Sequence, residues 1–327
     1  MQLAITSQNR HYRNWKTPKK FIEWIFYQSD LHHMQKKSTK SLGLGNHKKI
    51  TIQSKTDKRG LSIMEEGIKK DEMGRKFITS DIGVKVFVDF KDNLIVDPND
   101  PKITSQARNW RYSRGIVKGL SYLGSENSED AMTWNVFKTL EKLNPEKWFS
   151  EIFPQIILDK DEQFIDPMLR FWDKYFPPML RSFPEGEMHV DLTIETSNKL
   201  IFIEAKYKAD ISKNTKHDPN RDQIIRNIDV GTWAAKKRAK EFYFALLTLK
   251  TNTYSIDKLN YYKSNPSNII DQIGSYRRDI KDYVALCENI HVIYWDQILN
   301  SLQNLQLANK VELNTTNLID YLNDKLF

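Results

Sequence analysis

The stretch EMHVDLTIETSNKLIFIEAKYK, residues 187–208, decides the fold of this 327-residue chain. It contains two runs of alternating apolar residues on either side of Ser197-Asn198, a pattern typical of two strands joined by a two-residue turn. In that register Ile194 pairs with Ile201, and Leu192 pairs with Ile203. Because side chains alternate along a strand, we expect one core face, made of Val190, Leu192, Ile194, Ile201, Ile203 and Ala205.

The opposite face of this hairpin collects Asp191, Thr193, Glu204 and Lys206. Asp191 and Glu204 would face each other with Cβ atoms about 5 Å apart, and carboxylates so close repel unless a cation separates them. Mg²⁺ suits that position because it binds carboxylate oxygens and retains waters. Lys206, about 6.6 Å further along the strand, is placed to position or deprotonate a water, or to stabilise charge on a phosphate. The pattern predicts metal-assisted phosphodiester hydrolysis, and the alternative is an ordinary exposed hairpin face.

Asp191, followed after twelve residues by Glu204-Ala205-Lys206, resembles the signature of the PD-(D/E)XK nuclease superfamily. The resemblance covers residues 121–298 and implies the restriction-endonuclease-like fold, an α/β fold with a mixed sheet flanked by helices. The sequence departs from the family pattern at one point, since Val190 stands where the motif has its proline.

The resemblance also implies site residues outside the hairpin. An acidic residue on the preceding helix often joins the metal site in this family, and both Glu129 and Asp130 match that position. Gln223 matches a glutamine that some members carry on the following helix. The implied catalytic residues are Asp191, Glu204, Lys206, Glu129 and Gln223, and the implied metal ligands are Asp191, Glu204, Glu129 and the Ala205 carbonyl. Mg²⁺ is the implied cofactor, with Mn²⁺ as a substitute, and DNA is implied as the substrate more than RNA.

The rest of the chain has the pattern of alternating strands and helices. Helices are expected at 17–28, at 125–143 with Ser128 as N-cap, from Pro219 with Asp218 as N-cap, at 266–289 and at the C-terminus. Strands are expected at 48–54, at 83–90 and 93–98 as a second hairpin, at 241–250 and at 291–298. Residues 144–186 are expected to be irregular with short helices. The segment 98–115 is expected to connect an N-terminal region, 1–115, to the nuclease domain, 116–327.

Charge is concentrated in the N-terminal quarter of the chain. Residues 1–80 contain 17 Lys and Arg against 7 Asp and Glu, a net charge of +10, whereas the whole chain carries +8. A basic segment with aromatic residues is typical of binding to a polyanion, most often nucleic acid. A solvated basic arm is the alternative. The expected N-terminal region is therefore a basic α+β segment that binds nucleic acid or a partner.

Composition sets further limits. The single cysteine, Cys287, excludes an internal disulfide, fits a reducing compartment and is expected to be a small buried side chain. No stretch approaches the roughly 18 apolar residues of a membrane-spanning helix, and the first residues lack a secretory signal, so we expect a cytoplasmic protein. The seven histidines show no zinc-ligand spacing.

The site residues and the resemblance together favour a Mg²⁺-dependent endodeoxyribonuclease, and the resemblance implies a role in restriction, defence, repair or mobile-element biology. Three alternatives stay open. The first is a non-catalytic nucleic-acid-binding protein with the same fold. The second is a junction resolvase that acts as a homodimer, and the third is a subunit whose N-terminal region docks on a partner protein.

Overall fold

The computed structural model describes residues 67–109, 119–179, 185–214, 218, 220–308 and 315–327. The chain divides into two compact units, 1–57 and 58–327, and only the second contains described residues. The helix expected at 17–28 and the strand expected at 48–54 lie outside the described residues, as does most of the basic segment.

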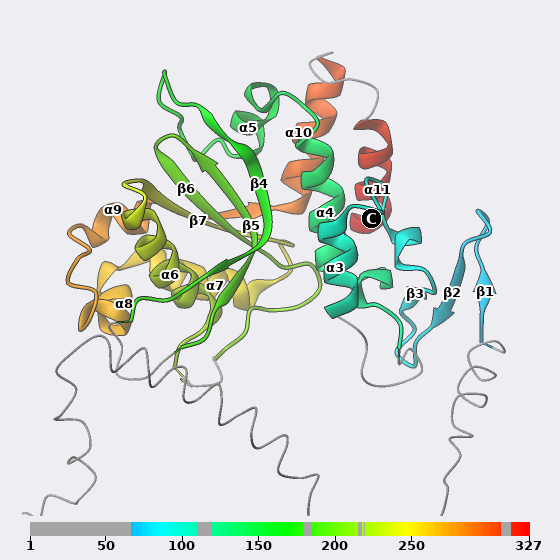
Figure 1. The fold of residues 1–327 in the computed structure, drawn as a ribbon, viewed down its shortest axis with the longest axis horizontal. Coiled ribbons are helices and arrows are strands. Elements are labelled where there is room, and N and C mark those ends of the chain that lie inside the picture. Colours follow the sequence, from blue (N-terminus) through cyan, green and yellow to red (C-terminus); the bar gives the residue numbers. More distant parts are fainter. Residues whose placement is uncertain (1–66, 110–118, 180–184, 215–217, 219, 309–314) are drawn as a thin grey trace, which may run out of the picture. The chain divides into compact units, whose positions relative to one another are not determined.

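A five-stranded mixed sheet forms the centre of the second unit (Figure 1). Its strands are β4 (Phe164–Tyr175), β5 (Met188–Thr196), β6 (Lys199–Ala205), β7 (Glu241–Thr248) and β8 (Ile290–Tyr294), in the order β4-β5-β6-β7-β8. The pairs β4–β5 and β5–β6 are antiparallel, and β6–β7 and β7–β8 are parallel. The chain is therefore α/β, as the sequence predicts.

The hairpin register is confirmed, because Leu192 pairs with Ile203 and Ile194 pairs with Ile201. The strand expected at 241–250 is β7. The strand expected at 291–298 is β8, but it is shorter, because helix α10 begins at Trp295.

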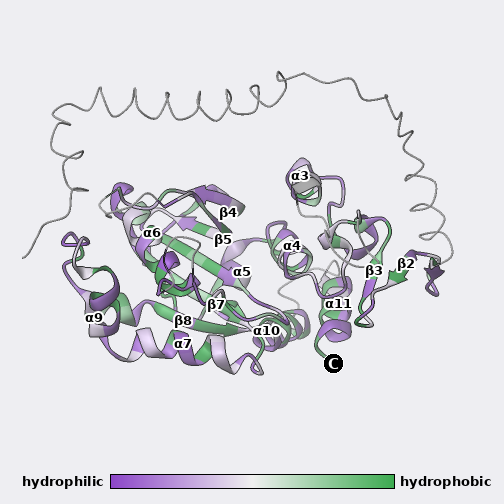
Figure 2. Ribbon diagram, turned by 90° about the horizontal axis from the view of Figure 1, so that it is seen from below, coloured by the Kyte–Doolittle hydropathy of each residue, from purple (hydrophilic) through white to green (hydrophobic). Residues whose placement is uncertain are grey.

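Helices cover both faces of this sheet. One face packs with α3 (Pro101–Asn109), α4 (Glu129–Leu140), α5 (Pro145–Ile152), α10 (Trp295–Leu307) and α11 (Thr316–Leu326). The other packs with α6 (Gln223–Lys237), α7 (Thr253–Ser264), α8 (Pro266–Ile269) and α9 (Tyr283–Glu288). Figure 2 shows the apolar strands β5, β7 and β8, with more polar residues on α7 and α9. Every residue of β6 is buried, so this strand of the hairpin has no exposed face.

Strand β5 changes the face on which its apolar side chains pack at Asp191. Leu192 and Ile194 lie in the core cluster with α4 and α10, whereas Met188 and Val190 lie in the cluster with α6. The expectation that Val190 shares a face with Leu192 is therefore wrong. On the neighbouring strand β4, Phe171 pairs with Leu192 and Asp173 pairs with Val190. Trp172, between them, has a left-handed φ of 49°. That conformation interrupts the regular alternation of a strand.

The long strand β4 lies within residues 144–186, where only irregular structure and short helices were expected. The expectation is right for α5 and wrong for β4. Pro167 argues against a strand in the sequence because it has no N–H to donate. The structure tolerates it because β4 is an edge strand whose register is irregular between Phe164 and Leu169.

A second sheet of three short antiparallel strands precedes the main sheet. It contains β1 (Lys69–Lys70), β2 (Lys76–Thr79) and β3 (Lys85–Phe87). The expectation of a second hairpin formed by 83–90 and 93–98 is wrong. Strand β3 pairs with β2, and the chain then enters a 3₁₀ turn, η2 (Phe90–Asn93). Asp89 caps that turn by accepting a hydrogen bond from the Lys91 N–H. No strand forms in the described segment 93–98.

Helix boundaries follow the capping residues. Ser128 caps α4 by accepting a hydrogen bond from the Ala131 N–H, as predicted. Helix α6 begins four residues later than expected, because Asp222 rather than Asp218 provides the cap through the Ile225 N–H. The helical region expected at 266–289 is broken into α8, a π-turn η4 (Ile270–Gly274) and α9.

The packing of the described residues does not divide the chain near residue 115, where the domain boundary was expected. Helix α3 lies within the segment expected to be a connection, and Ile103 and Ala107 belong to the same core cluster as α4 and α10. The compact unit extends back to residue 58. None of the helices in the described ranges is long and apolar enough to cross a membrane.

Candidate active site

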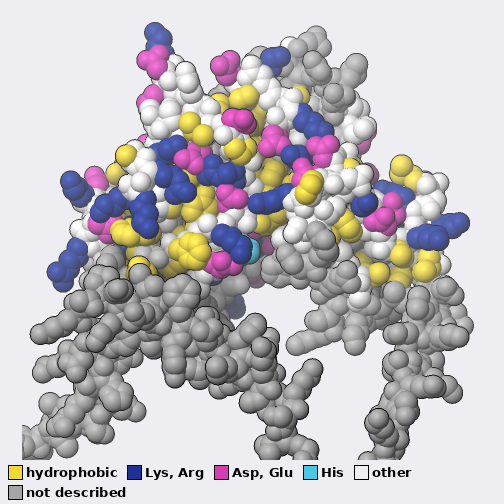
Figure 3. Space-filling view, in the orientation of Figure 1, with side chains coloured by type: hydrophobic (Ala, Val, Ile, Leu, Met, Phe, Trp, Pro, Cys, Tyr) yellow, Lys and Arg dark blue, Asp and Glu magenta, His cyan; other side chains and the backbone are white. Residues whose placement is uncertain are grey.

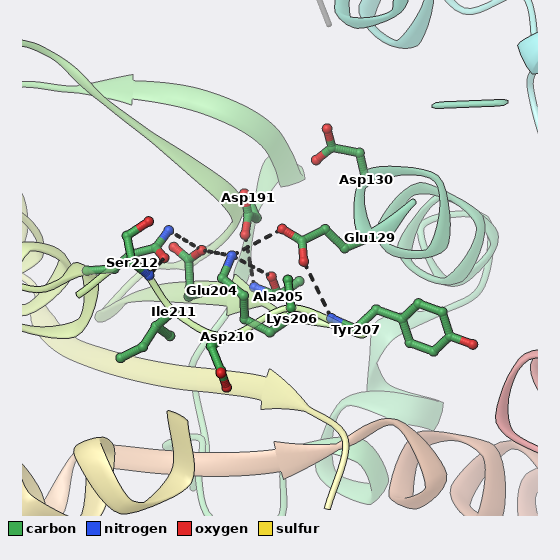
Figure 4. Close-up of polar contacts among 12 residues, drawn as sticks. Glu129, Asp130, Asp191, Glu204, Ala205, Lys206, Tyr207, Asp210, Ile211 and Ser212 are labelled. Carbon is green, nitrogen blue, oxygen red and sulfur yellow. Dashed lines mark hydrogen bonds and ion pairs between the residues drawn. The ribbon is translucent and has the colours of Figure 1, made fainter. Parts of the chain in front are cut away.

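The site lies where the ends of β5 and β6 meet the N-terminus of α4 (Figure 4). Asp191 comes from β5 and Glu204 from β6. Lys206 directly follows β6, and Glu129 is the first residue of α4. Segments far apart in the sequence therefore bring the three expected carboxylates and the expected lysine together.

The Lys206 ammonium occupies the centre of this group. Its Nζ lies 2.6 Å from Glu204 Oε1, 3.1 Å from Glu129 Oε1 and 3.0 Å from the Ala205 carbonyl oxygen. The backbone of Lys206 is fixed as well, because its N–H donates to Leu247 O and its carbonyl accepts from Trp295 Nε1. Strand β7 and helix α10 thus hold the lysine in position.

Two amides from α6 hold the Glu204 carboxylate from the other side. Gln223 Nε2 donates to Glu204 Oε1, and Asn227 Nδ2 donates to Glu204 Oε2 at 3.0 Å. Residues four apart lie on one face of a helix, so both amides reach the same side chain. Asn227 Oδ1 is buried and has no hydrogen-bond partner among the residues that the structure describes, which leaves an acceptor available for a water or ligand at the site.

The two acidic residues at the start of α4 have different surroundings. Glu129 contacts Lys206 through Oε1, and its Oε2 accepts a hydrogen bond of 3.4 Å from the Tyr207 N–H. Asp130 instead accepts from Trp172 Nε1 at 2.9 Å and from Gln106 Nε2 at 3.4 Å. Figure 4 shows its carboxylate pointing away from Lys206. Of the two candidates, Glu129 is the one that contacts the other site residues.

Asp191 lies one residue beyond the last pair of the β5–β6 ladder. Its Oδ2 accepts a hydrogen bond of 2.9 Å from the Ala205 N–H, which fixes the side chain beside the Glu204 strand. A carboxylate from each strand therefore reaches the same end of the hairpin, as the register predicts.

The site holds more negative charge than Lys206 neutralises. Burial, and then repulsion from Glu204, raises the pKa of Asp191 well above its usual range. Burial also raises the pKa of Glu129. Burial lowers the pKa of Lys206, but attraction to Glu204, Asp191 and Glu129 outweighs it and raises that pKa well above its usual range. Three carboxylates share one ammonium in a buried space.

The donor set can be compared with the needs of Mg²⁺. Within the described residues, no three His, Cys, Asp or Glu side chains gather in an arrangement that could hold a metal ion. The Lys206 ammonium contacts the oxygens of Glu204, Glu129 and Ala205 instead. These are hard oxygen donors of the kind that Mg²⁺ binds, and the excess negative charge favours a divalent cation. The chemistry of the residues fits Mg²⁺, provided that the ammonium moves aside.

Two residues that support the site were missed in the sequence. Trp295 holds the Lys206 carbonyl, and the Tyr207 backbone holds Glu129. Tyr207 directly follows Lys206, so its place in the sequence is a signal that could have been used. Trp295 gives no such signal, because it lies 89 residues from Lys206 and only the fold brings it near.

Other residues weighed in the sequence lie away from these contacts. Glu187 and His189 are exposed and contact each other, and Glu187 also pairs with Lys174 at 2.8 Å. Arg226 pairs with Glu185 at 3.0 Å. Cys287 is buried as expected, and its Sγ lies 3.4 Å from the Tyr262 carbonyl oxygen.

No protein-family model, curated protein or solved structure matches this chain.

Proposed function

We propose that the chain is a Mg²⁺-dependent nuclease that hydrolyses phosphodiester bonds in DNA. The observation that carries the proposal is the convergence of Glu129, Asp191 and Glu204 around Lys206, with each carboxylate held by hydrogen bonds. A plain surface hairpin does not explain it, because Glu204 is 1% exposed and Lys206 is 6% exposed. Charged groups so deeply buried are costly unless they are paired or bind an ion.

The residues divide into three roles in this proposal. Asp191, Glu204, Glu129 and the Ala205 carbonyl would hold Mg²⁺, which supplies Lewis acidity toward a phosphate oxygen and a more acidic bound water. Lys206 would orient the attacking water or stabilise negative charge that develops on the phosphate. Gln223 and Asn227 hold Glu204 and keep its carboxylate in one orientation.

The proposal extends to the basic segment of the sequence. The basic residues of 1–80 would add affinity for DNA through their charge. The expected location, the cytoplasm, rests on cysteine usage and composition alone.

Cleavage of supercoiled plasmid with Mg²⁺, with Mn²⁺ and with EDTA tests the proposal. We expect nicking by the wild-type chain with either ion, none with EDTA, and none by Glu204→Ala. Equal nicking by wild type and Glu204→Ala would contradict the assignment of Glu204. Salt-sensitive DNA binding without cleavage by either protein would favour a binding protein of the same fold. Preference for branched over linear DNA would identify a junction resolvase.

A further inference from the structure

Tyr207 connects the candidate active site to the C-terminal helix α11. Its backbone N–H contacts Glu129 Oε2, and its hydroxyl donates to the Lys325 carbonyl oxygen. The Lys325 ammonium in turn donates to the Glu126 carbonyl oxygen at 2.7 Å. The Lys208 ammonium lies over the Tyr207 ring, 5.1 Å from its centroid. Two lysines are thus held directly beside a residue that contacts the site.

The small sheet joins the same group through Glu126. The Lys85 N–H donates to Glu126 Oε1 at 2.8 Å, and Val86 forms a bridge with Ser125. Arg75 and Lys85 both lie over the Phe87 ring, at 4.8 and 4.9 Å from its centroid. Figures 1 and 2 both show α11 next to β3. Glu126 therefore contacts a lysine from each of the two elements.

The resulting cluster, Arg75, Lys85, Lys208 and Lys325, has more positive than negative charge. Its acidic neighbours are Glu126, Asp92, which lies close enough to Arg75 for their charges to interact, and Asp71, which pairs with Arg75 at 2.8 Å and with Lys85 at 3.4 Å. Burial lowers the pKa of Lys325 to about 8; Glu126 opposes this effect, and Lys208, Lys85 and Arg75 add to it. Four cations against these three carboxylates leave an excess of positive charge that an anion would relieve.

We propose that Arg75, Lys85, Lys208 and Lys325 form a subsite that binds the phosphate backbone of the DNA substrate beside the active site. The inference rests on the proposed function. Lysines bind phosphates as point charges, and such contacts position a nucleic acid without reading its sequence. Lys208 is exposed and follows Glu204 by four residues, so a phosphate bound there lies near the cleavage site. Figure 3 shows further Lys and Arg side chains, with some acidic ones, over the small sheet, where Lys69, Lys70 and Lys76 are exposed.

Binding of the full chain to a fluorescent DNA duplex in EDTA, measured by anisotropy over a range of salt concentrations, tests the subsite without cleavage. We expect Lys208→Gln and Lys325→Gln each to bind about five- to tenfold more weakly, and each to reduce the slope of log affinity against log salt by about 0.9. Lys208→Arg keeps the charge and should bind like wild type. Lys281→Gln is the matched control, because this exposed lysine precedes α9, which lies at the opposite end of the described structure from α11 (Figure 1).

The outcomes separate this inference from the proposed function. Wild-type affinity and slope in Lys208→Gln and Lys325→Gln would overturn the subsite, even if the chain cleaves DNA. An equal loss in Lys281→Gln would also overturn it, since the effect would then be one of net charge alone. Weakened binding in the two cluster variants, with no cleavage by wild type in Mg²⁺, would support the subsite and contradict the nuclease.

Discussion

The Lys206 ammonium lies 2.6 Å from Glu204 Oε1, although the two residues are only two positions apart in the chain. Glu204 and Lys206 are two residues apart, so alternation places their side chains on one face. Strand β6 ends at Ala205, and Lys206 directly follows it with its ammonium against the Glu204 carboxylate. The ammonium also contacts Glu129 and the Ala205 carbonyl, so it stands among the same oxygens that we expect to bind Mg²⁺. Lysine and metal ion would therefore compete for these oxygens.

Replacing this lysine tests that competition. We expect Lys206→Met to lower the free energy of unfolding by about 3 kcal/mol in EDTA, because it leaves buried carboxylates without a cation. Added Mg²⁺ should recover part of the loss, since the freed oxygens can bind the ion. Urea unfolding with EDTA and with Mg²⁺ measures both effects.

Lys199→Met is the matched control for that experiment. Lys199 is also buried, begins the same strand and pairs with Glu162 at 2.5 Å, but it lies at the other end of β6. Its loss should also destabilise the protein, and Mg²⁺ should not recover it. The same response to Mg²⁺ in both variants would show that the ion does not act at the Lys206 site.

The two acids that start α4 should differ in their effect on cleavage. Glu129→Gln removes a charge beside Lys206 and should reduce the cleavage rate roughly 10- to 100-fold. Asp130→Asn should keep a rate close to wild type and lose about 1 kcal/mol of stability, because Asp130 accepts from Trp172 and Gln106. Single-turnover cleavage and urea unfolding distinguish the two. A larger loss of rate in Asp130→Asn would reverse the assignment.

Gly231 allows α6 to approach the sheet closely enough for its amides to reach Glu204. A Cβ at this position would lie 2.0 Å from Phe242 Cε2 on β7. Gly231→Ala should therefore lose about 1–3 kcal/mol, since the steric overlap outweighs a gain in helix propensity of about 1 kcal/mol. Phe242→Leu should recover part of that loss in the double variant. Thermal unfolding of the single and double variants checks this, and purely additive losses would contradict it.

His291 should make stability fall in mild acid. Burial, with a smaller effect of Lys263, lowers its pKa to about 4 from the ordinary value of 6.5. Between these pH values the unfolded chain binds a proton that the folded protein does not, so stability is complete above pH 6.5 and falls toward pH 4. Between pH 7 and 4, wild type should lose about 2–3 kcal/mol more than His291→Phe, which keeps a ring beside Tyr243. Parallel pH profiles of the two proteins would contradict this account.

The sequence is sufficient for the hairpin because local rules determine it. Ser197-Asn198 sets the register that pairs Leu192 with Ile203, and Ser128 sets the start of α4. It is insufficient for β4, where Pro167 argues against a strand that the sheet edge nevertheless accommodates. The sequence also failed to predict that the face of β6 that carries Glu204 is buried, because α6, from further along the chain, packs on that face.

The same distinction applies to the site. Asp191, Glu204 and Lys206 lie on one hairpin, so its register brings them to the same end of the sheet, although the regular alternation of β5 is interrupted at Asp191. The choice between Glu129 and Asp130 needed the fold, since neighbouring positions on a helix point in different directions and only tertiary contacts decide which meets Lys206. Trp295 could not be found in the sequence, because its contact with Lys206 depends on how α10 follows β8.

The most direct test of the central claim compares two carboxylates of the same hairpin in a plasmid cleavage assay with Mg²⁺. Asp191 is partly buried at the site, whereas Glu187 is exposed and pairs with Lys174, so Asp191→Asn and Glu187→Gln each replace a carboxylate by its amide in different places. We predict metal-dependent cleavage by wild type and by Glu187→Gln, and none by Asp191→Asn when that variant is folded. Equal cleavage by all three proteins, or none by wild type, would contradict the claim that this hairpin carries a nuclease site.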